Sequence, residues 1–230
     1  MARERALDRP ATAHRGKQRD LLELICGYGL IMAVIWTPRP AQRFFYGITV
    51  TYLAIVLWRS FEGPEAMGLR SRDLLQSSWI ALLAAVLSGV GLLFAIHART
   101  LHAPVSAALF IRSFWGYALW SFVQQMLLVD FFLRRLLHLL PTRNSAVASA
   151  AVLFASAHLP NPILTGVTLV MGIAACALFL RYRNLWPLAA AHAILGITLA
   201  VTIPATVIRN MRVGIGYLHY KPHTPATGHS

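Results

Sequence analysis

The chain has 230 residues, of which 57% are hydrophobic and 13% are charged, and its mean hydropathy is +0.58. Soluble domains are close to half apolar and a quarter charged, so this composition excludes an ordinary soluble domain and predicts an all-α, polytopic membrane helix bundle. At about 20 residues per span, the length allows about seven or eight transmembrane helices.

The formal net charge is +13. In a soluble protein this charge would suggest nucleic acid as a partner. Here the basic residues lie in tails and loops between apolar runs, which is typical of membrane topology. We therefore expect no nucleic-acid partner, and a modest attraction to membrane lipids with anionic headgroups.

The chain begins with a polar, basic stretch. Residues 1–20 include five arginines and a lysine, and they predict a disordered tail on the cytoplasmic side. This stretch lacks the apolar core of a cleavable signal peptide, so the first apolar run, 21–36, is expected to stay as an anchor.

Further apolar runs predict the rest of a membrane domain over residues 21–208, with its motif-bearing core at about 113–203 and a polar C-terminal tail at 209–230. Seven spans would leave this basic tail outside, against the positive-inside rule. Either 103–112 joins its neighbours in an eighth crossing, or the tail lies on the surface.

Cys26 and Cys176 lie in apolar runs and are interpreted as packing residues. The predicted spans after the first are 44–58, 79–96, 113–140, 144–158, 163–180 and 185–203.

Three ionisable side chains lie inside different apolar runs: Asp130, His158 and His192. Asp130 is the last acidic residue of the chain. A carboxylate at membrane depth is costly, which favours a functional role. The structural alternative is an ion pair with Arg134, four residues on and on the same face of a helix. A lone histidine in an apolar helix is likewise often structural.

Two chemistries fit these three residues. Two histidines and one carboxylate are a ligand set for catalytic zinc, with an open position for water. Without metal, the carboxylate would activate water while the histidines hold the water or the substrate. The sequence is thus compatible with two alternatives. The site works without a cofactor, or it holds a divalent metal such as zinc bound by Asp130, His158 and His192.

The three ionisable residues lie in the segments VDFFLR (129–134), FASAH (154–158) and HAILG (192–196). These segments resemble, in order and spacing, the motifs of the CPBP intramembrane proteases, the family of CAAX proteases and bacteriocin-processing enzymes. The usual motifs are Glu-Glu-x-x-x-Arg, Phe-x-x-x-His and His-x-x-x-Asn. The resemblance covers roughly residues 68–203, including a GLR segment at 68–70.

The resemblance implies an integral membrane endopeptidase, in a bacterial inner or plasma membrane, that hydrolyses a membrane-associated, possibly prenylated, peptide or protein with activated water. Val129 stands where the family has its first glutamate, and Gly196 where it has asparagine. Asp130 would then be the base or a ligand, Arg134 its partner, and Gln125, one turn from Val129, would orient water or an oxyanion. Two alternatives remain: a family member without catalysis that acts as a membrane binding or scaffold protein, and a small transporter with a proton relay.

Overall fold

The structure is a computed structural model that describes residues 4–71 and 74–221, with side chains from residue 16 onward. Every regular element within these ranges is helical, which confirms the all-α prediction. The elements are α1 (Glu4–Trp36), α2 (Ala41–Arg59), α3 (Leu74–Ser77), α4 (Trp79–His97), α5 (Ala107–Met126), the π-helix η1 (Leu127–Leu133), α6 (Arg134–Leu139), α7 (Arg143–Ser156), α8 (Pro162–Tyr182), α9 (Trp186–Thr202), α10 (Ala205–Ile208), the 3₁₀-helix η2 (Arg209–Met211) and α11 (Gly214–Leu218).

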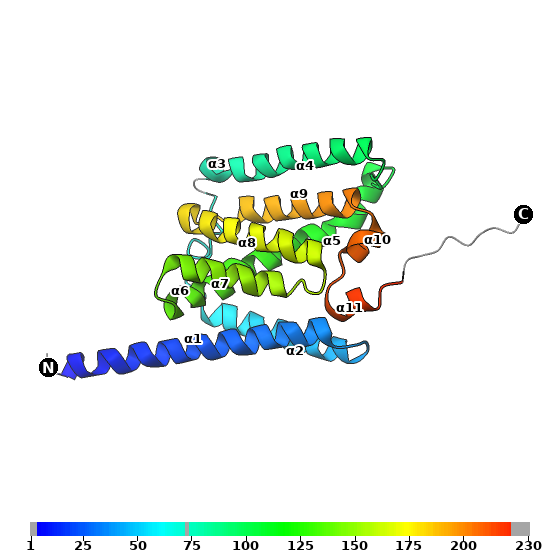
Figure 1. Ribbon diagram of the computed structural model, residues 1–230. Coiled ribbons are helices and arrows are strands. Elements are labelled where there is room, and N and C mark those ends of the chain that lie inside the picture. The colour runs from blue at the N-terminus through cyan, green and yellow to red at the C-terminus, as the bar shows by residue number, and fades with distance from the viewer. Residues whose placement is uncertain (1–3, 72–73, 222–230) are drawn as a thin grey trace, which may run out of the picture.

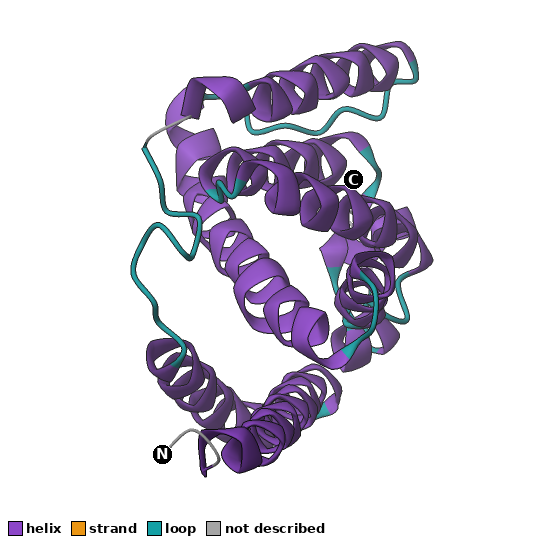
Figure 2. Ribbon diagram, turned by 90° about the vertical axis from the view of Figure 1, so that its left-hand side faces the viewer, coloured by secondary structure: helices purple, strands orange, loops and turns teal. Residues whose placement is uncertain are grey.

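The helices form a bundle in which the α1–α2 pair lies on one side and α4 on the opposite side (Figures 1 and 2). Helix α9 packs against both α4 and α5, while α7 packs against α8 and η1. The core is centred on η1, where Leu128, Phe131 and Leu133 are fully buried. The segment that carries the first motif is therefore the best-buried part of the fold.

Local sequence signals explain where the helices around this core begin. Ser106 and Thr142 cap α5 and α7, since each hydroxyl accepts a hydrogen bond from the backbone N–H three residues on. Asn161 caps α8 in the same way and is followed by Pro162 in the first helical turn. These caps fix the helices that bear the first two motifs.

The start of α9, which bears the third motif, is held by the GLR segment. The Leu185 N–H donates to the Gly68 carbonyl at 2.8 Å, and the Asn184 side chain donates to the Arg70 carbonyl. Gly68 has a φ of +73°, and a Cβ there would meet the Phe179 ring, so the close approach requires glycine. This segment thereby sets the position of α9 relative to α8.

Three stretches are long and apolar enough to cross a membrane: Leu74–His97, Ala107–Leu139 and Pro162–Tyr182. A fourth forms if Trp186–Thr202 and Ala205–Met211, bent by 114°, make one broken span. For the described residues, the prediction of seven or eight spans is wrong. Helix α7 has 14 residues, about 21 Å at 1.5 Å per residue, whereas the hydrocarbon core is about 30 Å thick.

The two predicted tails also differ from the structure. Helix α1 begins at Glu4, so the backbone of 4–20 is helical where a disordered tail is predicted. The helix extends from its apolar half into a stretch with four arginines and three alanines, which are good helix formers, and it continues through Gly16 and Pro10. In the predicted polar tail 209–230, residues 209–218 include η2 and α11, and α11 contacts α1. Residues 1–3 and 222–230 lie outside the described part.

Two adjacent arginines join η1 and α6 to distant parts of the chain, and neither is in a salt bridge with Asp130. Arg135 is buried, and its Nη2 lies 2.7 Å from Glu23 Oε2. Its Nη1 donates to the Phe131 carbonyl at 3.0 Å, and its guanidinium stacks 4.3 Å from the Phe131 ring centroid. Arg134 instead pairs with the exposed Glu62. The predicted Asp130–Arg134 ion pair is therefore replaced by two ion pairs to upstream acids.

This difference predicts the relative stability of two alanine variants. Arg135→Ala should destabilise the protein by up to about 3–5 kcal/mol, because it leaves the Glu23 carboxylate with only the more exposed Arg19, 3.2 Å away, as an ion-pair partner. Arg134→Ala should cost at most about 1 kcal/mol, because its ion pair with Glu62 is largely exposed. The measurement is the thermal unfolding midpoint and folded yield in detergent. Equal losses for the two variants would contradict the assignment.

Candidate active site

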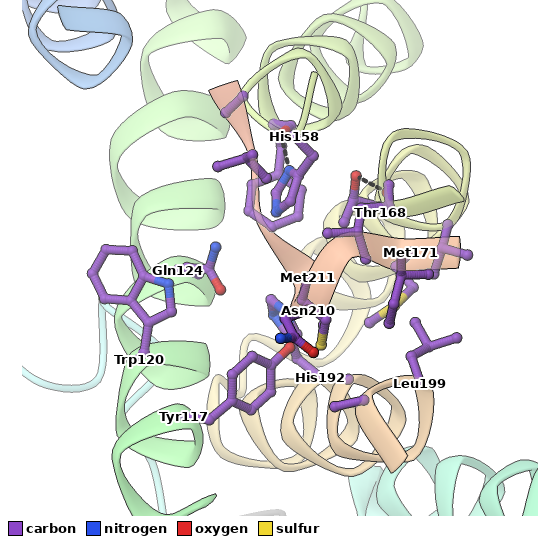
Figure 3. A pocket seen from close by; sticks show the side chains of 18 of the residues that line it. Tyr117, Trp120, Gln124, His158, Thr168, Met171, His192, Leu199, Asn210 and Met211 are labelled. Atoms are coloured by element: carbon purple, nitrogen blue, oxygen red, sulfur yellow. Dashed lines mark hydrogen bonds between the residues drawn. The ribbon is translucent and has the colours of Figure 1, made fainter. Parts of the chain in front are cut away.

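A pocket of about 720 Å³ opens in the middle of the bundle. Its wall combines α5, the turn after α7, α8, α9 and the segment around η2 (Figure 3). Most of the lining is apolar, and the described residues that line it include no aspartate or glutamate. The side chains labelled in Figure 3 are Tyr117, Trp120, Gln124, His158, Thr168, Met171, His192, Leu199, Asn210 and Met211.

The structure brings His158 and His192 to this one pocket, as the sequence predicts for two members of a shared site. His158 lies in the turn after α7, and His192 lies in α9. The ring of Phe154 contacts both edge-on, with centroid distances of 5.1 Å to His158 and 6.0 Å to His192. The phenylalanine of the second motif therefore packs against both histidines.

The protonation of His158 follows from its hydrogen bond. Its Nδ1 lies 2.8 Å from the Phe154 carbonyl oxygen. A carbonyl only accepts, so Nδ1 carries the hydrogen, and in the neutral ring Nε2 keeps a free lone pair. Burial lowers the pKa of His158 below its ordinary value and so favours this neutral form. His158 Nε2 can thus accept a proton from a molecule in the pocket.

His192 is more deeply enclosed than His158. It is 4% exposed, and its Nδ1 has no hydrogen-bond partner among the described residues. A buried polar nitrogen without a partner is costly, so it needs a partner such as an ordered water or a ligand, or a role in function. The nitrogen can be satisfied by water or by a ligand.

Asp130 does not join the two histidines. It is buried in η1, does not line the pocket, and its Oδ2 has no hydrogen-bond partner within the described ranges. In those same ranges, no three His, Cys, Asp or Glu side chains come together as a metal site. The residues present therefore do not fit the three-ligand zinc centre of Asp130, His158 and His192.

The π-helix explains the position of Asp130. After the neighbours Ser113 and Phe114, the pocket-lining side chains follow each other at helical steps of three or four residues. An α-helix would continue after Leu127 with residue 130 or 131, but the next lining residue is Phe132, five positions on. In a π-helix the hydrogen bonds run from i to i+5, which displaces the register. The lining residues up to Leu127 are Ser113, Phe114, Tyr117, Trp120, Gln124 and Leu127.

The same helical steps identify which glutamine faces the pocket. Gln124 lines it, whereas Gln125, the residue predicted from the sequence, is buried between α5 and α9. Gln125 Nε2 lies 3.5 Å from the Leu188 carbonyl oxygen. The prediction of Gln125 counted one helical turn back from Val129, which does not line the pocket. One turn back from Leu127, which does line it, is Gln124.

The pocket also contains residues that sequence reasoning missed. Asn210 and Met211 belong to η2, in the predicted polar tail, and line the pocket (Figure 3). Their φ angles of +50° and +55° are left-handed, a conformation that asparagine adopts readily and that is uncommon for methionine. The buried Asn161 side chain anchors this segment by donating to the Ile208 and Arg212 carbonyls.

One part of the chain matches a family of known proteins. Residues 106–198, which hold all three motifs, match the family model of the Rce1-like type II CAAX prenyl endopeptidases. The chain carries an Rce1-like domain of the CPBP family over these residues. No curated protein and no solved structure matches the chain. The candidate membrane spans and the family of this domain indicate an integral membrane protein.

The two positions at which the chain departs from the CPBP motifs are filled by its own packing. Val129 is 1% exposed within the core around η1. Gly196 lies against Tyr117: a Cβ at position 196 would overlap the phenol oxygen and lie 2.7 Å from Cζ. Position 129 is closed by the core around it, and position 196 can take a larger side chain only if the Tyr117 ring moves aside.

Restoring the family's first glutamate is therefore expected to damage the protein. Val129→Glu would bury an unpaired carboxylate in the core, with a penalty on the order of several kcal/mol. Leu127→Glu is the matched control, because position 127 faces the open space of the pocket and not the close-packed core. The unfolding midpoint in detergent should fall much further for Val129→Glu. A stable Val129→Glu variant with new proteolytic activity would overturn this assignment.

Proposed function

We propose that the protein is an intramembrane endopeptidase that hydrolyses a peptide bond of a membrane-associated, lipid-modified protein or peptide with water activated by His158 and His192. One observation carries the proposal: the second and third motifs place their histidines on one pocket, with His158 Nε2 as a free proton acceptor. The family match supports the peptide substrate and the hydrolytic chemistry.

The proposed reaction uses neutral imidazole as general base. Water lies between the substrate carbonyl carbon and His158 Nε2, which accepts a water proton as the C–O bond forms. The tetrahedral intermediate then collapses, the C–N bond breaks, and the same proton passes from His158 to the leaving amine. His192 positions the water or the carbonyl with a ring nitrogen. No group other than the substrate and one water is consumed.

The apolar lining supports a lipid-modified substrate. Trp120, Met171 and Leu199 give the pocket large apolar surfaces beside the histidines. A volume of about 720 Å³ is within the range of pockets that enclose sizeable ligands. Substrate would reach it from the bilayer, with the basic N-terminal residues on the cytoplasmic side.

A second candidate function is binding without catalysis. It is favoured by the absence of any carboxylate among the described residues that line the pocket. In this alternative, the same apolar pocket holds the lipid-modified peptide, and the histidines only contribute hydrogen bonds. Cleavage and binding measured on the same variants separate the two functions.

The decisive variants are His158→Ala, His192→Ala and Asp130→Asn. Cleavage of a quenched fluorescent peptide with a farnesylated cysteine should fall by about 10²–10⁴-fold in each histidine variant, the usual contribution of a general base. Asp130→Asn should retain activity, because Asp130 does not reach the pocket. The matched control is His97→Ala, at the exposed end of α4.

Unfolding midpoints must show that each variant is folded. Loss of cleavage in Asp130→Asn with His158→Ala unaffected would reverse the proposed roles. A wild type that binds the farnesylated peptide but cleaves no member of a broad peptide panel would establish the binding function instead.

A further inference from the structure

We infer that the Tyr117 hydroxyl donates the hydrogen bond that holds the substrate's carbonyl oxygen, from the place that a side chain at position 196 would otherwise fill. This inference rests on the proposed function and adds a third working residue to the two histidines. It assigns to α5 a role in the site that none of the three motifs contains.

The first support is the contact between Tyr117 and Gly196. A Cβ on Gly196 would overlap the hydroxyl oxygen and lie 2.7 Å from Cζ and 2.8 Å from Cε1. The phenol therefore occupies the space in which a larger residue at 196 would begin. Glycine at this position is what allows the hydroxyl to reach α9.

The second support is the position of this contact relative to His192. Residues 192 and 196 are four apart in α9, so they lie one turn apart on the same face. Tyr117 and His192 both line the pocket, and Figure 3 shows the phenol projecting from α5 towards the labelled His192. A carbonyl oxygen beside the hydroxyl would thus lie within the same part of the pocket as the histidines.

The third support is the use of the two threonine hydroxyls in the lining. Thr168 Oγ1 donates to the Leu164 carbonyl at 2.7 Å, and Thr49 Oγ1 donates to the Phe45 carbonyl at 2.7 Å. Both threonine hydroxyls therefore donate within their own helices. Tyr117 supplies an O–H at the end of a rigid ring, beside α9, and a donor aimed at a developing oxyanion strengthens as the charge grows.

The test is Tyr117→Phe, which keeps the ring and removes only the donor. In cleavage of the farnesylated peptide by the full-length protein, kcat should fall by about 10²–10³-fold, KM should rise by no more than severalfold, and the unfolding midpoint should stay close to wild type. Tyr182→Phe makes the same change at a tyrosine at the C-terminal end of α8, outside the pocket lining, and should leave kcat unchanged. A Tyr117→Phe enzyme with wild-type kcat would overturn the inference.

A rescue variant separates the donor from a packing role. Tyr117→Ala should lose activity, and the double variant Tyr117→Ala, Gly196→Asn should regain part of it, because the vacated space accepts an amide donor. Gly196→Asn alone should lose activity through the clash with the ring. The control is Gly196→Ala in the same Tyr117→Ala background. If it restores as much activity as Gly196→Asn does, only side-chain volume matters and the donor role of Tyr117 is wrong.

Binding distinguishes failure of this inference from failure of the proposed function. If the wild type binds the farnesylated peptide without cleaving it, the endopeptidase proposal fails, yet the hydroxyl can still hold the carbonyl. Tyr117→Phe should then raise Kd severalfold. An unchanged Kd, or a wild type that binds no peptide, would overturn the role of Tyr117 as well.

Discussion

The π-helical turn at Leu127–Leu133 is the constraint on which the rest of the site depends. Its longer hydrogen-bonding repeat turns Val129 and Asp130 into the core and brings Phe132 to the pocket. It also places Nη1 of Arg135 near the Asp130 and Phe131 carbonyl oxygens. Nη2 of the same guanidinium forms the ion pair with Glu23. A single register shift thus removes the acid from the pocket and joins α1 to the core.

Because Asp130 does not line the pocket, the polar chemistry of the pocket depends on its histidines and on uncharged hydrogen-bond donors. The Phe154 carbonyl fixes the tautomer of His158, and the Phe154 ring packs against both imidazoles. Gly196 gives the phenol of Tyr117 access to the same part of the pocket. An apolar surround strengthens each of these hydrogen bonds, because little water competes with them. The arrangement supports hydrolysis through neutral groups.

The sequence predicted the helical class and the meeting of His158 with His192, since both follow from hydropathy and from motif order. It did not predict the exclusion of Asp130, because a π-helix has no signature in a 3.6-residue pattern. The partners of Arg134 and Arg135 come from acids more than 70 positions upstream, which local spacing cannot reveal. Hydropathy also did not predict that residues 209–213 help to line the pocket. Hydrogen bonds from the buried Asn161 side chain hold that segment in place, and a hydropathy pattern does not report them.

The central claim, that His158 and His192 act as one catalytic unit, is tested most directly by a mutant cycle in single-turnover cleavage of the farnesylated peptide. Residues that work as a unit show strongly non-additive losses. The account predicts that the double variant His158→Ala, His192→Ala is no slower than the slower single variant. A double variant whose loss equals the product of the two single losses, or a single variant with the wild-type rate, would contradict it.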